Sequence, residues 1–500
     1  MKRRFLLLLV VLLSSLFASC GSGSSSLSKI TSVTVSPSIT TLEIEQNQQF
    51  TVEVKGTGDF NASVNWYVND IQGGNATFGT ISWTGVYIAP SVVPEPATVT
   101  IKAVSVQDST KFGTASVTIT GLSQPKLLWT TYFEGLGYGG LSGVLTDEDQ
   151  NVIAAGTTYD DSITGTQRAV VLSTDKSGRK RWIYTSDGPA DARDIVLALD
   201  LKSVFVVGIL GNYPEQLPLL FAVNSAGSKV LESVCSTMTG SAIVDAAGDY
   251  SRIYLALWSD SFILTSDLTG ALDCTNTIPA AVSDLSESYI SAVSPMDDGL
   301  VVAGYRRMTN ECWKGAYPFV QKITFSGQLE WRFDFESTIG PRGSALNAPK
   351  VAVADETGQT VLYLTCSIST PRGEDCLPLT PNDLGRYMTA KLDGNGNLKW
   401  VNLWDGDIVP ACEAYPSDIL VDPRGGVVIV GYSSGTNCSP YVGGVASYDS
   451  DGFLRWTMKP TFKGTDTLCK SATISSDGRF LYLVGMTFPD LFVAGYALPQ

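Results

Sequence analysis

Short runs of alternating hydrophobic and polar residues cover the chain from about residue 30 to its end. Such a run places every second side chain on one face, as in a half-buried β-strand. Unbroken apolar runs, such as NVIAAG ending at Gly156 and GVVIVG ending at Gly431, are typical of strands buried on both faces. No long helical pattern follows the first twenty residues. We therefore predict an all-β protein.

Residues 30–122 form a first predicted domain, with short alternating strands separated by turn residues. This spacing predicts a β-sandwich, with Val64, Trp66 and Val68 of VNWYVND on its core face. The runs TLEIEQNQQFTVEVKGTG, VNWYVND and GTISWTGVYIAP resemble bacterial Ig-like domains of surface proteins. That resemblance implies a spacer or adhesive module. The domain contains no cysteine, so it lacks the inter-sheet disulfide of antibody domains.

From residue 125 to residue 500 one unit repeats. A buried strand, often closed by glycine, precedes another apolar strand and a hairpin such as KLDGNGNLKW. With one further strand before it, each unit holds four strands, which at a period near fifty residues predicts a β-propeller. The buried strands end at Gly156, Gly208, Leu257, Gly304, Cys366, Gly431 and Gly485, which are 52, 49, 47, 62, 65 and 54 residues apart.

The chain ends within its seventh unit, at the third strand FVAGYALPQ. We predict that KLLWTTYF, at the start of the propeller, supplies the missing fourth strand and closes a ring of seven blades, since open sheet edges are otherwise left unpaired. One outer-strand side chain of each unit is expected to pack between neighbouring blades. These positions are Trp129, Trp182, Leu231, Cys274, Trp331, Trp400 and Trp456.

Three segments carry a family resemblance: KLDGNGNLKW, the VNLWDG after it, and LLWTTYFEGLGYGG. They resemble the seven-bladed propeller repeats of secreted bacterial proteins, with a D-x-x-G-x-x-x-W turn and W-x-T-Y-x-G-G. The same hairpin is similar to repeats of pyrroloquinoline-quinone enzymes and of a propeller lipoprotein in outer-membrane protein assembly. Those proteins typically have eight blades, whereas seven units are counted here. A quinone-cofactor-binding propeller therefore stays an alternative, and no cofactor is predicted.

The N-terminus has a basic start, a short apolar run and small residues before Cys20. This order resembles the lipobox of bacterial lipoproteins, in which the segment before the cysteine is removed and the cysteine carries lipid. We expect a signal peptide over 1–19 and a lipidated Cys20 with a Ser/Gly tether over 20–29. The alternative is an ordinary signal peptide. By resemblance to enterobacterial sorting, Gly21 favours the outer membrane or cell surface.

Charge and composition exclude several functions. The net charge of −15 argues against a nucleic-acid partner. The chain has no histidine, which excludes Ser-His-Asp, Cys-His and His-zinc chemistry. The turns DGNGN (393–397) and DSDG (449–452) have oxygen ligands at calcium-loop spacing, but neither continues to a glutamate at the twelfth position. Hairpin turn chemistry explains both, so no metal site is predicted.

A few loop residues are candidates for ligand binding. Aromatic side chains in loops suit stacking on sugar rings or peptide. Neighbouring carboxylates suit binding or, in an alternative interpretation, glycoside cleavage by a carboxylate-based enzyme. The alternative without function is packing within solvated loops. The candidates are Trp313, Arg372, Trp404, Asp405, Asp407 and Glu413.

Eight cysteines remain beside Cys20, an even number in an exported protein, where disulfides persist. We number the strands of a blade one to four from the channel outward. The tight-turn rim then holds the turns between strands one and two and between three and four. The loop rim holds the other loops and the links between blades. All eight map to the loop rim, and the predicted pairs are Cys366–Cys376, Cys412–Cys438, Cys235–Cys274 and Cys312–Cys469.

The sequence thus predicts a lipid-anchored protein of the cell envelope that is not an enzyme. It is expected to bind or scaffold an envelope protein or glycan through propeller loops. Its anchor is tested by growing cells with labelled palmitate. We expect label on the parent protein and none on Cys20→Ser, because only the thiol of Cys20 is placed to receive the lipid. Equal labelling of both proteins would refute the anchor.

Overall fold

The computed structural model describes residues 28–499 apart from short gaps, and every regular element in this part is a β-strand. No helix long and apolar enough to span a membrane occurs among these residues. The chain divides into two units, Met1–Ser123 and Gln124–Gln500. The gaps are 160–165, 198–202, 212–214, 239–240, 242, 250, 258–261, 281–287, 311–312, 336–343, 346–348, 370–384, 405–412, 435–439 and 464–465.

The first unit contains three sheets, ordered β1-β4, β2-β11-β10-β5-β6 and β3-β9-β8-β7, around one hydrophobic core. Trp66 and Val68 are buried and Val64 packs against the same core, which confirms the predicted core face. The strands are β1 (Lys29–Ser36), β2 (Ile39–Glu43), β3 (Asn47–Gln49), β4 (Thr51–Thr57), β5 (Val64–Val68), β6 (Ile71–Gln72), β7 (Gly74–Asn75), β8 (Gly79–Ile81), β9 (Val86–Ile88), β10 (Thr98–Ser105) and β11 (Phe112–Thr120).

The second unit begins with four antiparallel sheets whose strands follow one another in chain order. They are β13 (Tyr138–Thr146), β14 (Val152–Tyr159), β15 (Gln167–Thr174) and β16 (Lys180–Thr185); β17 (Ala190–Leu197), β18 (Ser203–Leu210), β19 (Leu217–Asn224) and β20 (Lys229–Val234); β21 (Ile243–Gly248), β22 (Arg252–Leu257), β23 (Phe262–Asp267) and β24 (Leu272–Pro279); β25 (Ser288–Met296), β26 (Gly299–Asn310), β27 (Trp313–Ile323) and β28 (Leu329–Asp334).

Three further sheets complete the described part of this unit. They are β30 (Lys350–Glu356), β31 (Gln359–Ser369), β32 (Gly385–Asp393) and β33 (Leu398–Trp404), with β29 (Ser344–Ala345) also pairing β31; β34 (Glu413–Val421), β35 (Val427–Ser434), β36 (Tyr441–Tyr448) and β37 (Leu454–Met458); and β38 (Thr467–Ile474), β39 (Phe480–Thr487) and β40 (Asp490–Ala497) with β12 (Lys126–Phe133).

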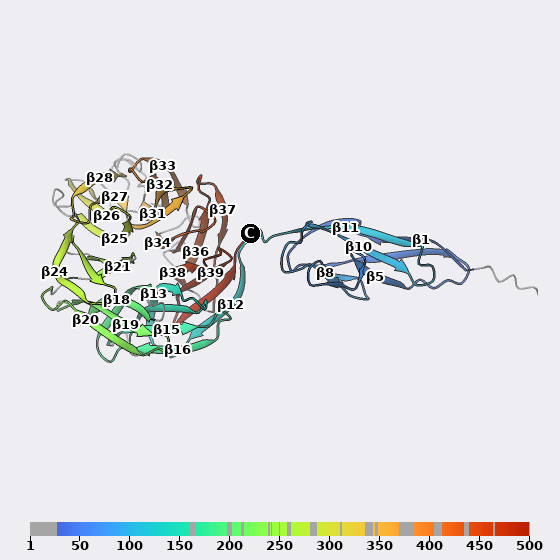
Figure 1. The fold of residues 1–500 in the computed structure, drawn as a ribbon, viewed down its shortest axis with the longest axis horizontal. Helices are drawn as coiled ribbons and strands as arrows, with labels where there is room; N and C mark the ends of the chain where they lie inside the picture. The colour runs from blue at the N-terminus through green and yellow to red at the C-terminus, as the bar shows by residue number, and fades with distance from the viewer. Residues whose placement is uncertain are drawn as a thin grey trace, which may run out of the picture. The chain divides into compact units, whose positions relative to one another are not determined.

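The sheets of the second unit stand around a common centre, so this unit has the architecture of a β-propeller (Figure 1). Each innermost strand contacts the innermost strand of the next sheet, in the cycle β13, β17, β21, β25, β30, β34, β38 and back to β13. Buried apolar side chains fill the spaces between neighbouring sheets. Both faces of each sheet are thereby covered, as two-sided apolar strands require.

The strand β12 pairs with β40, from Lys126 opposite Ala497 to Phe133 opposite Leu491. This confirms that KLLWTTYF is the fourth strand of the last sheet. The first and last strands of the second unit are therefore hydrogen-bonded to each other, and β12 pairs the edge of β40 that would otherwise be open.

The tryptophan of the repeated hairpin joins neighbouring sheets. Its indole N–H donates to a backbone carbonyl in the hairpin turn of the next sheet, at 3.0 Å for Trp129 to Lys176 and 2.9 Å for Trp182 to Ser225. The turn glycine lies against the indole: a Cβ on Gly178 would stand 2.5 Å from Trp129. We call this the Trp–turn contact. It recurs from Trp331 to Gly394 and from Trp400 to Ser450, at 3.1 Å each, and confirms the predicted packing at these four positions.

The turn itself is held by its aspartate. The Asp393 Oδ1 atom accepts the N–H groups of Asn395 and Asn397 at 3.0 and 2.9 Å, and Lys399 lies 2.8 Å from Oδ2. These contacts hold the pKa of Asp393 well below its usual range despite partial desolvation. Turn capping therefore accounts for the aspartate in DGNGN.

One disulfide joins the second and third sheets. Cys235 follows β20 and Cys274 lies within β24, and the two Cα atoms are 5.5 Å apart. This confirms the predicted pair. Cys274 occupies the position where other units carry tryptophan, and Leu231 packs over Gly270 at this junction. The disulfide thus joins two sheets whose outer strands, β20 and β24, carry Leu231 and Cys274 in the position of the tryptophan.

Two other predicted pairs are contradicted, and the fourth, Cys412–Cys438, lies outside the described residues. Cys366 and Cys469 are free thiols with no exposed surface, which contradicts Cys366–Cys376 and Cys312–Cys469. Cys366 lies inside β31 and Cys469 inside β38, and both side chains belong to cores between sheets, not to the loop rim. The cysteines outside the described residues are Cys312, Cys376, Cys412 and Cys438.

Candidate functional site

Three of the six predicted ligand-binding residues, Trp313, Trp404 and Glu413, lie in the described part of the chain. Trp404 was expected in a loop, but it ends β33, is 7% exposed and packs on Tyr387 at a ring-centroid distance of 5.0 Å. Trp313, also expected in a loop, begins β27 and pairs with Asn310. Glu413 begins β34. Arg372, Asp405 and Asp407 lie outside the described residues.

The innermost strands share an irregularity near the loop rim, where each of them begins. A β-bulge interrupts the register of six of these strands at the same level, and such bulges re-aim side chains. The shifts lie between Leu141 and Gly143, Ala192 and Asp194, Ile243 and Asp245, Ile290 and Ala292, Pro416 and Asp418, and Cys469 and Ser471.

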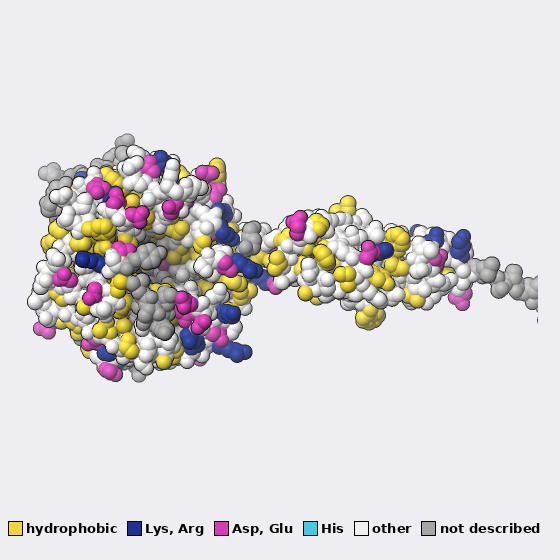
Figure 2. Space-filling view, viewed as in Figure 1, with side chains coloured by type: hydrophobic (Ala, Val, Ile, Leu, Met, Phe, Trp, Pro, Cys, Tyr) yellow, Lys and Arg dark blue, Asp and Glu magenta, His cyan; other side chains and the backbone are white. Residues whose placement is uncertain are grey.

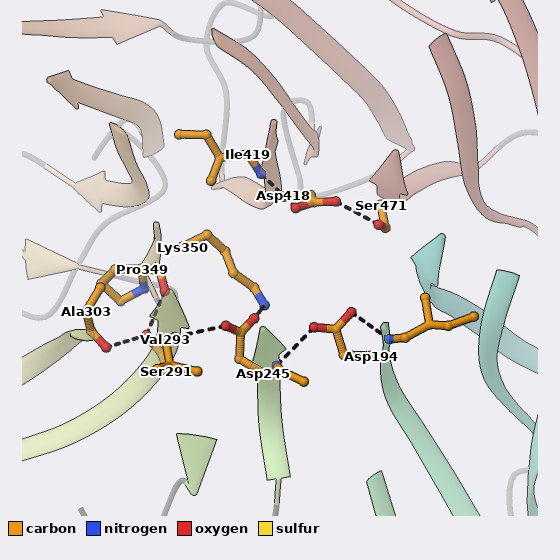
Figure 3. Close-up of polar contacts among 12 residues, drawn as sticks. Asp194, Asp245, Ser291, Val293, Ala303, Pro349, Lys350, Asp418, Ile419 and Ser471 are labelled. Carbon is orange, nitrogen blue, oxygen red and sulfur yellow. Dashed lines mark hydrogen bonds and ion pairs between the residues drawn. The ribbon is translucent and has the colours of Figure 1, made fainter. Parts of the chain in front are cut away.

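Three aspartates at these bulges bind the next innermost strand (Figure 3). The Oδ2 atom of Asp194 accepts the N–H of Ala246 at 3.1 Å, and Oδ2 of Asp245 accepts that of Val293 at 3.0 Å. In the same way Asp418 accepts the N–H of Ala472 at 3.1 Å and the hydroxyl of Ser471 at 2.7 Å. We call these three carboxylates the channel aspartates.

Elsewhere in the ring, serine side chains form hydrogen bonds to the backbone of the next sheet. The hydroxyl of Ser142 donates to the carbonyl of Ala192 at 2.8 Å, and that of Ser291 donates to Pro349 at 2.7 Å. The bulge level is thus a belt of side-chain to backbone bonds from one sheet to the next.

Lys350 supplies the cation among the channel aspartates. Its Nζ lies 2.5 Å from Oδ1 of Asp245, with side chains 26% and 12% exposed. Burial opposes the charged form of Lys350, but the charges of Asp245 and Asp194 outweigh it and raise its pKa. Burial, together with the charge of Asp245, raises the pKa of Asp194 to about 7. Burial also raises the pKa of Asp418.

A pocket of about 730 Å³ lies at the opposite, tight-turn rim, between the sheets of β25–β28 and β30–β33. Its lysines are already paired: Lys322 with Asp298 at 2.7 Å and Lys399 with Asp393 at 2.8 Å. The other lining residues are Met296, Asp297, Gln359, Thr360, Gly394 and Asn395. Both lysines of the lining are thus held by carboxylates, so the described lining of the pocket offers no free cation to anchor a ligand.

Aromatic side chains gather on the loop rim, close to the inner ends of the sheets. Tyr138 at the start of β13 lies 5.0 Å from Phe488 in the β39–β40 turn. Tyr289 and Tyr305 face each other across β25 and β26 at 5.4 Å. Tyr415 and Tyr432 do the same across β34 and β35 at 5.1 Å. These distances join ring centroids. The four paired tyrosines are half-buried, which leaves part of each ring accessible.

Sequence reasoning missed these pairs. A signal was present, because Tyr289 and Tyr415 each stand shortly before a bulge, in YISA and YPSD. On the face of the second unit shown in Figure 2, acidic, basic and hydrophobic side chains lie side by side. The loop rim is distinguished by its paired rings.

No family model matches the chain, and no curated protein matches it. Solved structures are similar to it. A proposed 6-phosphogluconolactonase from Bacteroides uniformis is 13% identical, with a TM-score of 0.38 over 70% of this chain and 89% of that one. The Dos1 propeller is 12% identical, with a TM-score of 0.40 over 81% and 90%. Chaetomium thermophilum Sqt1, bound to the N-terminus of ribosomal protein L10, is 14% identical, with a TM-score of 0.41 over 73% and 98%. At these identities and TM-scores the likenesses say nothing about activity.

The raised pKa of Asp194 has a consequence for stability. In the folded protein this carboxyl holds its proton up to about pH 7, whereas its ordinary pKa is 3.8. The folded state therefore binds more protons between these values. The contribution of the Asp194 carboxyl to the free energy of unfolding is complete below about pH 4 and is lost as the pH rises through about 7.

We expect Asp194→Asn to remove part of the decline in the free energy of unfolding between pH 5 and pH 7. One proton accounts for at most about 1.4 kcal/mol per pH unit. Urea unfolding at several pH values measures the slope, with Asp451→Asn on an exposed hairpin as the control. Identical slopes in Asp194→Asn and the parent would contradict the assignment.

Proposed function

We propose that the protein is a lipid-anchored binding protein of the cell envelope. Residues 1–19 serve as signal peptide, Cys20 carries the lipid and residues 20–29 form the tether. An Ig-like spacer over 30–122 presents a seven-bladed propeller over 125–500 that β12 closes. The propeller binds an envelope protein or glycan through its loop rim. The observation that carries this proposal is the set of partly exposed aromatic pairs at that rim.

A binding role fits the chemistry of the ring better than catalysis. The channel aspartates accept backbone N–H groups of neighbouring strands, so their oxygens are engaged in joining sheets. A general acid or base needs an oxygen directed at a substrate. Aromatic rings that are held by packing and only partly covered offer contact area at little cost in conformational entropy, which favours binding.

The two rims make different binding surfaces. The tight-turn rim consists of short hairpins that are occupied by turn capping and by the Trp–turn contact. The loop rim carries the longer connections, and its aromatic pairs lie at the ends of strands fixed by the belt of bulge contacts. A site on strand ends is held more rigidly than one on free loops.

The proposal is tested with a glycan array and with pull-downs from envelope extract. Tyr289→Ala removes one ring of a loop-rim pair. Phe453→Ala is the matched control, because Phe453 is 71% exposed in a tight-turn hairpin. We expect Tyr289→Ala to weaken retention of the partner about tenfold, in line with the loss of an aromatic anchor, and Phe453→Ala to leave it unchanged. If retention of the partner is lost with Phe453→Ala and not with Tyr289→Ala, the partner binds at the tight-turn rim and the proposal is refuted.

A further inference from the structure

Three tyrosines of one sheet form a small aromatic surface on the loop rim. Tyr415 and Tyr432 stack with their planes 29° apart, and Tyr441 meets Tyr432 edge-on with centroids 5.7 Å apart and planes at 79°. All three are half-buried. They lie on β34, β35 and β36, at the ends of these strands that reach the loop rim.

A lysine of the next sheet approaches the same rings. Lys470 stands at the bulge of β38, and its Nζ lies 4.3 Å from the centroid of the Tyr432 ring. The same ammonium donates to the hydroxyl oxygen of Tyr432 at 3.1 Å. The three tyrosines and Lys470 together are called the tyrosine–lysine site. It bridges the last two sheets of the ring.

Lys470 differs from Lys350 in its ion pairing. Among the described residues, no carboxylate lies within 4.0 Å of its ammonium, whereas Asp245 lies 2.5 Å from Lys350. Burial consequently lowers the pKa of Lys470 to about 8. A half-buried ammonium without an anion destabilises the folded protein.

Among the described residues, the titratable groups nearest Lys470 make other contacts. The adjacent thiol of Cys469 is buried, which raises its pKa and keeps it neutral. Asp418 is bonded to Ser471, and Asp466 accepts the N–H of Tyr441 at 2.7 Å. The hydroxyl of Tyr432 is itself a neutral acceptor. The tyrosine–lysine site therefore offers a positive charge beside planar aromatic surface, with no carboxylate of the described residues within 4.0 Å of its ammonium.

An ammonium group beside tyrosine rings suits a ligand that has both a negative charge and a rigid face. A sugar acid has a rigid ring whose C–H face suits stacking on tyrosine, hydroxyls that suit the phenol oxygens, and a carboxylate that suits the ammonium. An acidic peptide carries its carboxylate on a flexible chain and has no rigid face to stack. We propose that the tyrosine–lysine site binds a uronic-acid residue of an acidic polysaccharide. The inference rests on the proposed binding function and narrows its ligand.

The test uses the full chain and three probes: tetragalacturonate, its methyl ester and a tetraglutamate peptide. The ester keeps the sugar rings and removes the charge. We expect the parent protein to bind tetragalacturonate at least about tenfold more tightly than either other probe, since a charge-assisted contact accounts for such a factor. Equal affinity for the ester, tighter binding of the peptide, or no binding of tetragalacturonate would each overturn the inference.

Variants locate the site. Lys470→Met should reduce tetragalacturonate affinity about tenfold while leaving the thermal midpoint equal or higher, because it removes an unpaired half-buried charge. The preserved midpoint shows that the variant folds. Lys229→Met, which removes an exposed lysine of β20 paired with Glu232 at 2.7 Å, is the control and should bind as the parent does. Unchanged affinity of Lys470→Met would overturn the inference.

The pH dependence gives a readout that packing alone would not change. Affinity of the parent should fall as the pH rises through about 8, where free Lys470 loses its proton. Lys470→Arg should keep its affinity at pH 9.5, because a guanidinium remains charged. A parallel decline in both proteins would contradict the role of Lys470. A further outcome is that the protein does not bind tetragalacturonate while Tyr289→Ala still weakens retention of the partner. In that case the proposed binding function stands, and only the assignment of a uronic acid as the ligand is refuted.

Discussion

A sheet with two apolar faces is stable in water only when both faces are covered, and the second unit meets this requirement by arranging its sheets in a ring. Removal of one sheet from the ring would expose its own apolar faces and one apolar face of each neighbouring sheet to water. The closing pair, β12 with β40, is therefore as important as any single core, because it joins the first and last strands of the unit. The contacts between sheets follow from this constraint.

These contacts lie at different distances from the centre. The Trp–turn contact and the Cys235–Cys274 disulfide join outer strands, while channel aspartates and serines join innermost strands. Apolar side chains fill the region between them. The stronger polar groups are thus used to fix one sheet against the next. The proposed binding function uses what the described part of the loop rim exposes, namely the paired tyrosines and Lys470.

Several features were predictable because their chemistry is local. An aspartate, a glycine and a tryptophan at fixed spacing define the hairpin, whichever unit contains them. The missing strand of the seventh unit pointed to KLLWTTYF, and the structure confirms its pairing. Burial of Trp66 and Val68 also followed from simple alternation. Each of these predictions needed only neighbouring residues or a count of strands.

The errors and omissions concern positions that depend on the register between distant strands. Trp404 was expected in a loop because β33 is longer than the hairpin pattern suggested. Cys366 and Cys469 were assigned to a rim, yet they lie within strands and face cores. The tyrosine–lysine site requires the register of β34, β35 and β36 and a bulge in β38. Sequence spacing alone does not place residues of two sheets together.

Ring closure by β12 is the central claim, and deletion of residues 126–133 tests it most directly. Deletion of the equally long segment 21–28 is the control, because it removes no strand of the described part. Urea unfolding followed by tryptophan fluorescence is the measurement. Closure predicts that the 126–133 deletion abolishes the single cooperative transition or causes aggregation, while the control unfolds like the parent. A 126–133 deletion that unfolds with the parent's midpoint and slope would contradict the account.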